Sequence, residues 1–286
     1  MTLISGEALA ERLTRSNGLR VVDVRWYLGQ PGVGRRAYDA GHIPGAIFVD
    51  VDADLVAAEG PGRHPLPDPT AFAARLAELG IGDEHLVVAY DDVGGWVAAR
   101  LWWMLDDLGH REVAVLDGGL PSWSAAGHPL TTEEPSYPPA RLTLAGAWRR
   151  VIDRDDLRAR LGSAVLLDAR AGERYRGEVE PIDPVAGHIP TAISAPTAGN
   201  LDVRGRFLAP DALRSRFASL GADGDDVVTS CGSGVSACHH ALAMRIAGLP
   251  DPFLYPGSFS DWSRSGLPVV TGSEPGGLGS PTRGSP

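Results

Sequence analysis

An internal repeat constrains this chain more than any other feature. The Asp-x-Arg sequence at residues 23–25 recurs at residues 168–170, an offset of 145, and the Gly-His-Ile-Pro segment at residues 41–44 recurs at residues 187–190, an offset of 146. Two further matches pair residues 87–91 with 227–231 and residues 115–130 with 254–269. Several matches in one order at nearly one offset indicate a tandem duplication.

Predicted strands alternate with predicted helices along the first copy. Short apolar runs predict strands at residues 21–24, 47–49, 86–90 and 113–116. Helices are predicted at residues 6–14, with Ser5 as N-cap, and at residues 69–79 and 97–108, while residues 38–46 read as a turn-rich segment. The alternation predicts the α/β class, with two copies of a mostly parallel sheet flanked by helices.

The repeat also gives the expected domain boundaries. A chain of 286 residues is long enough for two domains of ordinary size. We expect an N-terminal domain at residues 1–131 and a C-terminal domain at residues 145–271, because Thr, Glu and Pro break the periodicity in a linker at residues 132–144. Residues 272–286 are rich in Gly, Ser and Pro, which predicts a disordered tail.

The composition excludes several classes of protein. A net charge of -10 argues against nucleic acid as a partner, since phosphate contacts need a basic surface. The chain has no Lys, so Arg side chains or backbone N–H groups must hold any anionic substrate. Two Cys do not make a disulfide framework, and neither a signal sequence nor an apolar run of ~18 residues is present. We therefore expect a cytoplasmic protein without a membrane partner.

The most informative short segment surrounds Cys231. An apolar run at residues 227–230 predicts a strand, a Gly-Ser-Gly sequence follows the cysteine, and residues 235–247 read as a helix. A cysteine in a tight loop at a helix N-terminus is stabilised as a thiolate by backbone N–H groups and the helix dipole. Packing alone would not need these glycines, which permit close approach of a ligand to the backbone.

The duplication sharpens the prediction, because position 91 is equivalent to Cys231 but holds Asp91. Only the C-terminal copy offers a thiolate, at the carboxyl end of its strand, where open α/β sheets bind ligands. His42 and His188 occur in both copies and so read as structural. Cys238, two helical turns after Cys231, reads as core packing rather than a second reactive thiol.

The chain resembles the two-domain thiosulfate and 3-mercaptopyruvate sulfurtransferases of the rhodanese-like family. Residues 231–237, Cys-Gly-Ser-Gly-Val-Ser-Ala, are similar to the family's Cys-Gly-Ser-Gly-Val-Thr-Ala, with Ser236 in place of Thr. The paired Gly-His-Ile-Pro segments add support, as does the stretch at residues 255–262, which resembles the family's Tyr-Asp-Gly-Ser-x-x-x-Trp. The resemblance covers residues 21–269.

The resemblance also implies a set of substrate-binding residues. In the mercaptopyruvate group an Asp, a His and two Arg line the site, and the matching positions of the first three hold Asp52, His64 and Arg174. The position of the second Arg holds Ile182, which removes one carboxylate clamp and favours thiosulfate or another donor. The neutral Gly-Ser after the cysteine instead resembles the mercaptopyruvate type, so both donors stay open.

The resemblance implies transfer of sulfur through a persulfide on Cys231. The donor is 3-mercaptopyruvate or thiosulfate, the acceptor is cyanide, a small thiol or thioredoxin, and no metal or organic cofactor is required. Five loop residues are expected to hold the anionic persulfide: Gly232, Ser233, Gly234, Val235 and Ser236.

Other interpretations of these residues remain open. His64 could instead lie in a surface loop, and Asp52 could cap a helix ahead of Leu55. A cysteine phosphatase would need an Arg six places after Cys231, where Ala237 stands, and the two cysteines lack the spacing of zinc or iron–sulfur ligands. A non-catalytic rhodanese-like binding module is the remaining alternative, and the intact cysteine loop argues against it.

Overall fold

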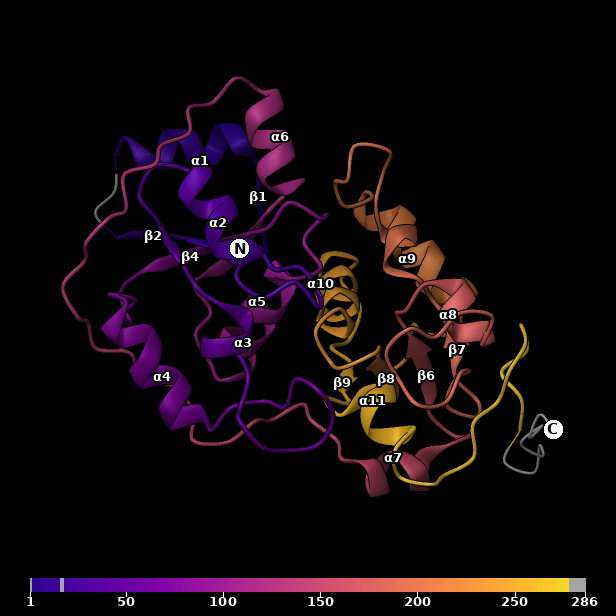
Figure 1. Cartoon of the computed structure of the whole chain (residues 1–286). Helices are drawn as coiled ribbons and strands as arrows, with labels where there is room; N and C mark the ends of the chain where they lie inside the picture. The colour runs from indigo at the N-terminus through magenta and orange to yellow at the C-terminus, as the bar shows by residue number, and fades with distance from the viewer. Residues whose placement is uncertain (1, 16–17, 278–286) are drawn as a thin grey trace. The chain divides into compact units, whose positions relative to one another are not determined.

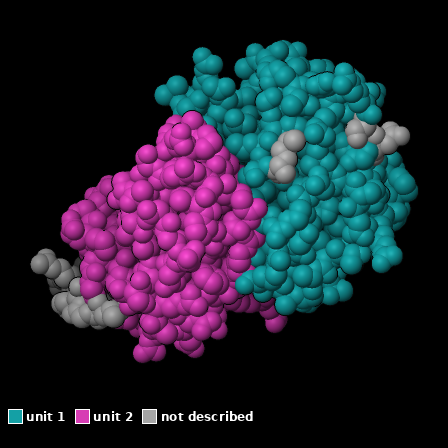
Figure 2. All heavy atoms as spheres, turned by 180° about the vertical axis from the view of Figure 1, so that it is seen from behind, with its two compact units in different colours: residues 1–58, 66–149, 201–207 teal, residues 59–65, 150–200, 208–286 magenta. Residues whose placement is uncertain are grey.

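The computed structural model describes residues 2–15 and 18–277, and its contacts divide these residues into two compact units. Unit 1 contains residues 1–58, 66–149 and 201–207, and unit 2 contains residues 59–65, 150–200 and 208–286, as coloured in Figure 2. We propose that the boundaries expected from the repeat, at residues 131 and 145, mark the two duplicated copies, since units defined by contacts need not follow them.

Unit 1 is built on a parallel sheet with strand order β1-β5-β4-β2-β3 (Figure 1). The strands are β1 (Leu3–Ile4), β2 (Leu19–Asp23), β3 (Ala46–Phe48), β4 (Leu86–Tyr90) and β5 (Val113–Leu116). The helices are α1 (Gly6–Leu13), α2 (Val33–Ala40), α3 (Val51–Asp54), α4 (Pro69–Glu78), α5 (Ala98–Asp107) and α6 (Gly119–Ala125). The Ser5 hydroxyl accepts the N–H of Ala8, which confirms the predicted N-cap of α1.

Unit 2 repeats the pattern with strand order β7-β6-β8-β9, again parallel. The strands are β6 (Val165–Asp168), β7 (Ile193–Ser194), β8 (Val227–Ser230) and β9 (Phe253–Leu254). The helices are α7 (Arg154–Arg160), α8 (Gly172–Arg176), the 3-10 turn η1 (Thr197–Asn200), α9 (Pro210–Ser219), α10 (Ala237–Ile246) and α11 (Ser258–Trp262). The α/β prediction for both copies is confirmed.

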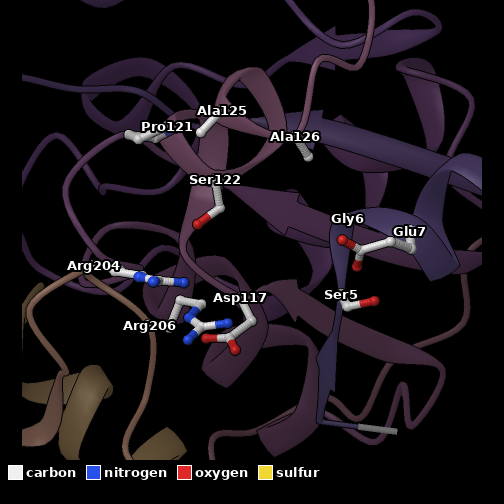
Figure 3. Close-up of a pocket in the computed structure, with 10 residues that line it drawn as sticks. All are labelled: Ser5, Gly6, Glu7, Asp117, Pro121, Ser122, Ala125, Ala126, Arg204 and Arg206. Carbon is white, nitrogen blue, oxygen red and sulfur yellow. The ribbon is translucent and has the colours of Figure 1, made fainter.

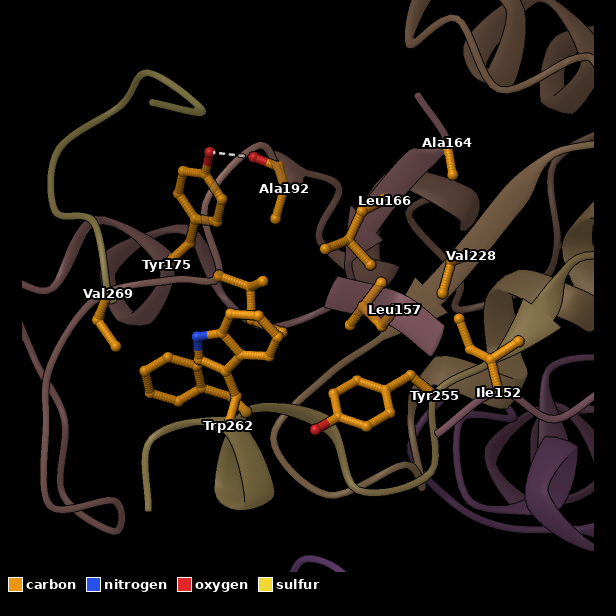
Figure 4. Packing of buried hydrophobic residues seen from close by; sticks show 12 residues of the cluster. Ile152, Leu157, Ala164, Leu166, Tyr175, Ala192, Val228, Tyr255, Trp262 and Val269 are labelled. Carbon is orange, nitrogen blue, oxygen red and sulfur yellow. Dashed lines mark hydrogen bonds between the residues drawn. The ribbon is translucent and has the colours of Figure 1, made fainter. Parts of the chain in front are cut away.

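The hydrophobic core of unit 2 gathers around Trp262 (Figure 4). The Trp262 indole donates to the carbonyl of Pro268 at 2.8 Å, as the equivalent Trp123 of unit 1 donates to Pro129 at 2.9 Å. The Tyr175 hydroxyl reaches the carbonyl of Ala192 at 2.6 Å. The Trp262 indole and the Tyr175 hydroxyl are thus satisfied by backbone carbonyls.

The repeated histidines serve the fold. His42 stacks on Tyr38 with ring centroids 3.8 Å apart, and His188 stacks on Tyr175 at 3.7 Å. Both rings also hydrogen-bond to backbone carbonyls through Nδ1 and Nε2. The repeated Asp-Arg pair is likewise a buried ion pair in each unit. These contacts support the structural interpretation.

One local expectation differs from the structure. Residues 38–46 were expected to be turn-rich, yet helix α2 extends to Ala40, stabilised by the stacking of Tyr38 on His42. In the expected tail, the N–H of Gly272 donates to Arg176 and the N–H of Thr191 donates to Pro275. Residues 278–286 of that tail lie outside the described residues.

Candidate functional site

The cysteine loop follows a central strand of unit 2. Cys231 comes directly after β8, which lies between β6 and β9, and is 2% exposed. Its Sγ atom accepts the N–H groups of Ser233 at 3.4 Å and Gly234 at 3.1 Å. Helix α10 begins a few residues later, at Ala237. The sulfur therefore lies against backbone donors near a helix N-terminus, an arrangement that favours an anion.

The loop depends on Gly234. This residue has φ +78°, and a Cβ atom placed on it would lie 2.5 Å from the carbonyl oxygen of Pro256. Both the backbone angle and the close approach require glycine. The second glycine of the Gly-Ser-Gly sequence is thus required for steric reasons.

The segment at residues 255–260 holds the cysteine backbone in place. The N–H of Cys231 donates to Ser258 Oγ at 3.0 Å, and this hydroxyl donates to the carbonyl of Tyr255 at 2.9 Å. Ser258 has φ +51°, a strained angle for a residue other than glycine. The carbonyl of Cys231 accepts the N–H of Phe259 at 3.0 Å. The backbone of Cys231 is therefore held at both its N–H and its carbonyl group.

His64 belongs to unit 2, because residues 59–65 pack with that unit. The side chain is 7% exposed, and Nδ1 lies 2.6 Å from Ser233 Oγ. The preceding N–H, of Arg63, donates to Ser260 Oγ at 3.0 Å. A buried imidazole bonded to the cysteine loop is not a surface-loop residue.

Arg174 lies in α8 and faces the same loop. Its Nη2 donates to Glu180 Oε1 at 2.7 Å, and its Nη1 lies 3.4 Å from the position that a Cβ on Gly232 would occupy. The charge of this guanidinium therefore lies beside the residue that follows the cysteine. Of the expected site residues, the structure gathers Arg174, His64 and the loop 232–236 around Cys231 within unit 2.

Two carboxylates at this site did not emerge from the sequence. The Asp183 side chain has no exposed area and pairs with Arg63, Arg174 and Arg264. Glu180 accepts the N–H groups of Ile182 at 3.1 Å and Asp183 at 3.0 Å. Burial alone would raise the pKa of Glu180, but hydrogen bonds from Arg174 and the Asp183 N–H hold it below its ordinary value. In the sequence, the acidic residues close to Pro181 could have indicated these two carboxylates.

Asp52 lies in unit 1 and does not cap a helix. Asp50 is the N-cap of α3, and its Oδ1 accepts the N–H of Asp52 at 2.9 Å and of Ala53 at 3.3 Å. Asp52 lies inside the helix, where its Oδ2 accepts the indole N–H of Trp26 at 2.9 Å. The N-cap alternative for Asp52 is therefore wrong, since the cap is two residues earlier.

The equivalent loop of unit 1 encloses a carboxylate. Asp91 is fully buried, and its two oxygens accept four backbone N–H groups at 2.8 to 3.0 Å. The donors are Val93, Gly95, Val97 and Ala98. Burial raises the pKa of Asp91, and these four bonds oppose the rise. The duplicated loop is thus able to surround an anion with N–H groups.

A separate cavity of about 440 Å³ lies wholly in unit 1, which lacks the cysteine (Figure 3). Arg206 lies beside Asp117 on its wall, and Glu7 lies across from them. Arg206 also pairs with Asp202 at 3.2 Å, and Asp117 accepts the N–H of Phe207 at 2.9 Å. Arg206 and Asp117 of this wall are thus already bonded to residues beside the cavity.

The structure also bears on metal and membrane alternatives. Both cysteines are free, and the buried Cys238 thiol donates to the carbonyl of Gly234 at 3.4 Å. Within residues 2–15 and 18–277, no group of three His, Cys, Asp or Glu side chains is arranged to hold a metal ion. Over the same residues, no helix has the length and apolar character needed to cross a bilayer.

Comparison with known proteins agrees with this geometry. The profile of the Rhodanese-like domain matches residues 5–126 and 153–265. A Pseudomonas aeruginosa protein named "Probable 3-mercaptopyruvate sulfurtransferase" is 47% identical over 279 residues, covering 94% of this chain and 98% of its own. The thiosulfate sulfurtransferase of Rattus norvegicus is 34% identical over 283 residues, covering 95% of each chain.

A solved structure gives the same result for the fold. The 3-mercaptopyruvate sulfurtransferase from Leishmania major superposes with a TM-score of 0.83 at 31% identity, over 93% of this chain and 75% of that one. Two domain matches, full-length relatives and a shared fold lead to one conclusion: the chain belongs to the rhodanese-like family, with two copies of the domain.

Proposed function

We propose that the chain is a sulfurtransferase that moves a sulfane sulfur from 3-mercaptopyruvate or thiosulfate through a persulfide on Cys231. The observation that carries the proposal is the pair of N–H groups, of Ser233 and Gly234, that contact the Cys231 sulfur. The names of the similar proteins support both donors.

The loop around Asp91 supports a persulfide at the equivalent cysteine. An Asp side chain ends two atoms beyond Cβ, whereas a thiol ends one atom beyond it and a persulfide ends two. The carboxylate of Asp91 accepts four N–H groups. A persulfide on Cys231 has the same reach and the same negative charge, so the N–H groups of Ser233 and Val235, which match those of Val93 and Gly95, would stabilise it.

The chemistry balances without a cofactor. The Cys231 thiolate attacks the outer sulfur of the donor and forms an S–S bond, while the bond between that sulfur and the rest of the donor breaks. Thiosulfate leaves as sulfite, and 3-mercaptopyruvate leaves as the enolate of pyruvate, which takes a proton. A thiol, cyanide or thioredoxin then attacks the outer sulfur, and the Cys231 thiolate is restored.

Roles follow for the residues around the sulfur. Gly232, Ser233, Gly234, Val235 and Ser236 hold the persulfide through the loop, and Arg174 binds the anionic end of the donor. His64, through Ser233, orients the donor or supplies its proton. Asp52 is assigned to donor binding by family resemblance alone. We place the protein in the cytoplasm, since both cysteines are free thiols.

Steady-state kinetics with both donors on one preparation test the proposal. Activity with at least one is expected, and mass spectrometry after donor treatment should find a gain of about 32 Da, one sulfur atom, on Cys231. Replacing Cys231→Ser should abolish both signals, whereas Cys238→Ser should keep them, because the Cys238 thiol bonds to Gly234 instead. Inactivity with both donors would overturn the substrate assignment.

A further inference from the structure

Arg63 and Arg174 both lie over the backbone of the cysteine loop. A Cβ atom placed on Gly232 would lie 3.0 Å from Nη2 of Arg63 and 3.4 Å from Nη1 of Arg174. Gly232 directly follows Cys231. Two guanidinium groups from distant segments of the chain therefore lie beside the residue that follows the thiol, within unit 2.

Buried carboxylates hold both guanidinium groups. Arg174 Nη2 bonds to Glu180, and Arg63 Nη1 bonds to Asp183. The segment that carries Arg63 is packed tightly, since a Cβ on the preceding Gly62 would lie 2.5 Å from the carbonyl oxygen of Gly257. Guanidinium groups fixed in this way lose little conformational freedom when an anion binds.

The orientation of Arg63 leaves its side edge for a ligand. Nε and Nη2 form the edge of a guanidinium that binds a carboxylate with two parallel hydrogen bonds. Nη1, outside that edge, takes the bond to Asp183. Nε is buried, and residues 2–15 and 18–277 supply no acceptor for it. A buried N–H group without an acceptor costs free energy, and a hydrogen bond to an oxygen atom of a ligand would remove that cost.

Ion pairs connect Arg63 and Arg174 to further charged side chains, and the charges of this connected group also favour an anion. Its cations outnumber its carboxylates by one, since four arginines face three acids in a chain of ion pairs. The members are Arg63, Arg170, Arg174 and Arg264, with Asp168, Glu180 and Asp183. Of these cations, Arg63 and Arg174 lie beside Gly232, whereas Arg264 is 47% exposed, so water screens its charge and its loss should change the field at the cysteine loop little.

In unit 1, too, a segment from elsewhere in the sequence lies over the loop, but at another position of the loop and with an apolar side chain. There the segment 201–207 covers the loop of Asp91, and the ring of Phe207 lies 3.3 Å from the position that a Cβ on Gly95 would occupy. The N–H of Phe207 donates to Asp117, as that of Arg63 donates to Ser260. An apolar side chain thus covers the copy without a thiol, and a cation covers the copy with one.

We propose that Arg63 binds the anionic end of the sulfur donor, a carboxylate or a sulfonate-like group, and determines donor affinity together with Arg174. It supplies from residues 59–65 the second guanidinium that Ile182 does not provide. The inference rests on the proposed function, because it names the residue that binds the negatively charged group of the proposed donors.

The kinetic test compares Arg63→Gln with Arg264→Gln as a matched control. Arg264 pairs with the same carboxylate, at 3.2 Å from Asp183, so loss of either cation disturbs Asp183 alike. We expect Arg63→Gln to raise the KM for the donor about tenfold with a smaller change in kcat. Arg264→Gln should leave the KM near that of the parent protein. Equal KM values for all three proteins, or equal rises in both variants, would overturn the role of Arg63.

A second measurement does not require sulfur transfer. In a Cys238→Ala background, alkylation of Cys231 by iodoacetate, a carboxylate, is compared with alkylation by neutral iodoacetamide. Arg63→Gln should lower the ratio of the two rates about fivefold to tenfold, and Arg264→Gln should not. An unchanged ratio would overturn the inference. Inactivity of the parent protein with both donors would remove only the proposed function, since the ratio still measures the attraction of Arg63 for an anion.

Discussion

The Nδ1 atom of His64 lies 2.6 Å from Ser233 Oγ, across 169 residues of sequence. The N–H of Ser233 in turn donates to the Cys231 sulfur at 3.4 Å. A single serine therefore connects the imidazole to the thiol. Both side chains are buried, so the connection is shielded from water, which strengthens its hydrogen bonds.

A double-mutant cycle tests this connection. Ser233→Ala and His64→Gln should each slow persulfide formation about 10- to 100-fold, because each removes one end of the hydrogen bond that positions the imidazole. The double variant should be no slower than the slower single variant, since residues that act as a unit are not additive. Rapid-mixing kinetics with one donor give the three rates. Additive losses would show that the two residues act independently.

The steric requirement at Gly234 leads to a second prediction. Gly234→Ala should lower kcat at least tenfold, since the new Cβ would lie 2.5 Å from the carbonyl oxygen of Pro256 and displace an N–H that contacts the sulfur. Gly266→Ala is the matched control, because Gly266 has φ +76° and no atom within 4 Å of its Cβ position. Both variants bear the backbone cost of about 1 kcal/mol. Equal activities in the two variants would contradict the steric account.

Much of this arrangement was predictable because it depends on local sequence. The repeat fixed the order of strands and helices, and the apolar run before Cys231 placed the thiol at the end of β8. Helix α4 begins at Pro69 after the cap Asp68, close to the predicted bounds. Such features follow from short-range patterns, which a single sequence records.

The remaining parts depend on contacts between distant residues. Segment 59–65 packs with unit 2 although the residues on either side of it belong to unit 1, and segment 201–207 packs with unit 1 although its flanking residues belong to unit 2. Arg63 and His64 therefore reach the cysteine loop through tertiary packing. The buried partner Asp183 lies 120 residues from Arg63. No periodicity encodes such a pairing. Helix α2 was missed because the glycines at positions 29, 32 and 34 favour a turn at its start.

The carboxylate of Asp91 should stabilise unit 1 without serving catalysis. Asp91→Asn replaces one acceptor oxygen with an amide NH2, which would face backbone donors that now bond to the carboxylate. We expect a loss of about 2 to 4 kcal/mol in the free energy of unfolding. Urea unfolding measures the loss, with the exposed Asp39→Asn as control. The activity per folded molecule should stay at the parent level, and a specific loss of kcat would instead give Asp91 a catalytic role.

Acid should weaken unit 2 through His240. The ring is fully buried, Nε2 lies 2.7 Å from the carbonyl of Ala195, and Nδ1 lies 3.0 Å from the Asn200 amide nitrogen. Asn200 Oδ1 accepts Nε of Arg216 at 2.9 Å, which points the amide N–H groups at the ring. Burial, reinforced by the charge of Arg216, lowers the pKa of His240 to about 4. The folded protein therefore keeps this ring neutral at neutral pH.

The sign of the pH effect follows from that difference. The unfolded chain binds a proton near pH 6.5 and the folded chain only near pH 4, so the stability from His240 is complete above about pH 6.5 and is lost as the pH falls toward about 4. One such group gives a slope of up to about 1.4 kcal/mol per pH unit. Urea unfolding at several pH values between 7.5 and 4.5 should show a shallower slope for His240→Gln than for the parent protein. His188, whose pKa burial also lowers, contributes equally to both slopes and cancels in the difference. Parallel slopes would mean that His240 takes up its proton in the folded state without penalty.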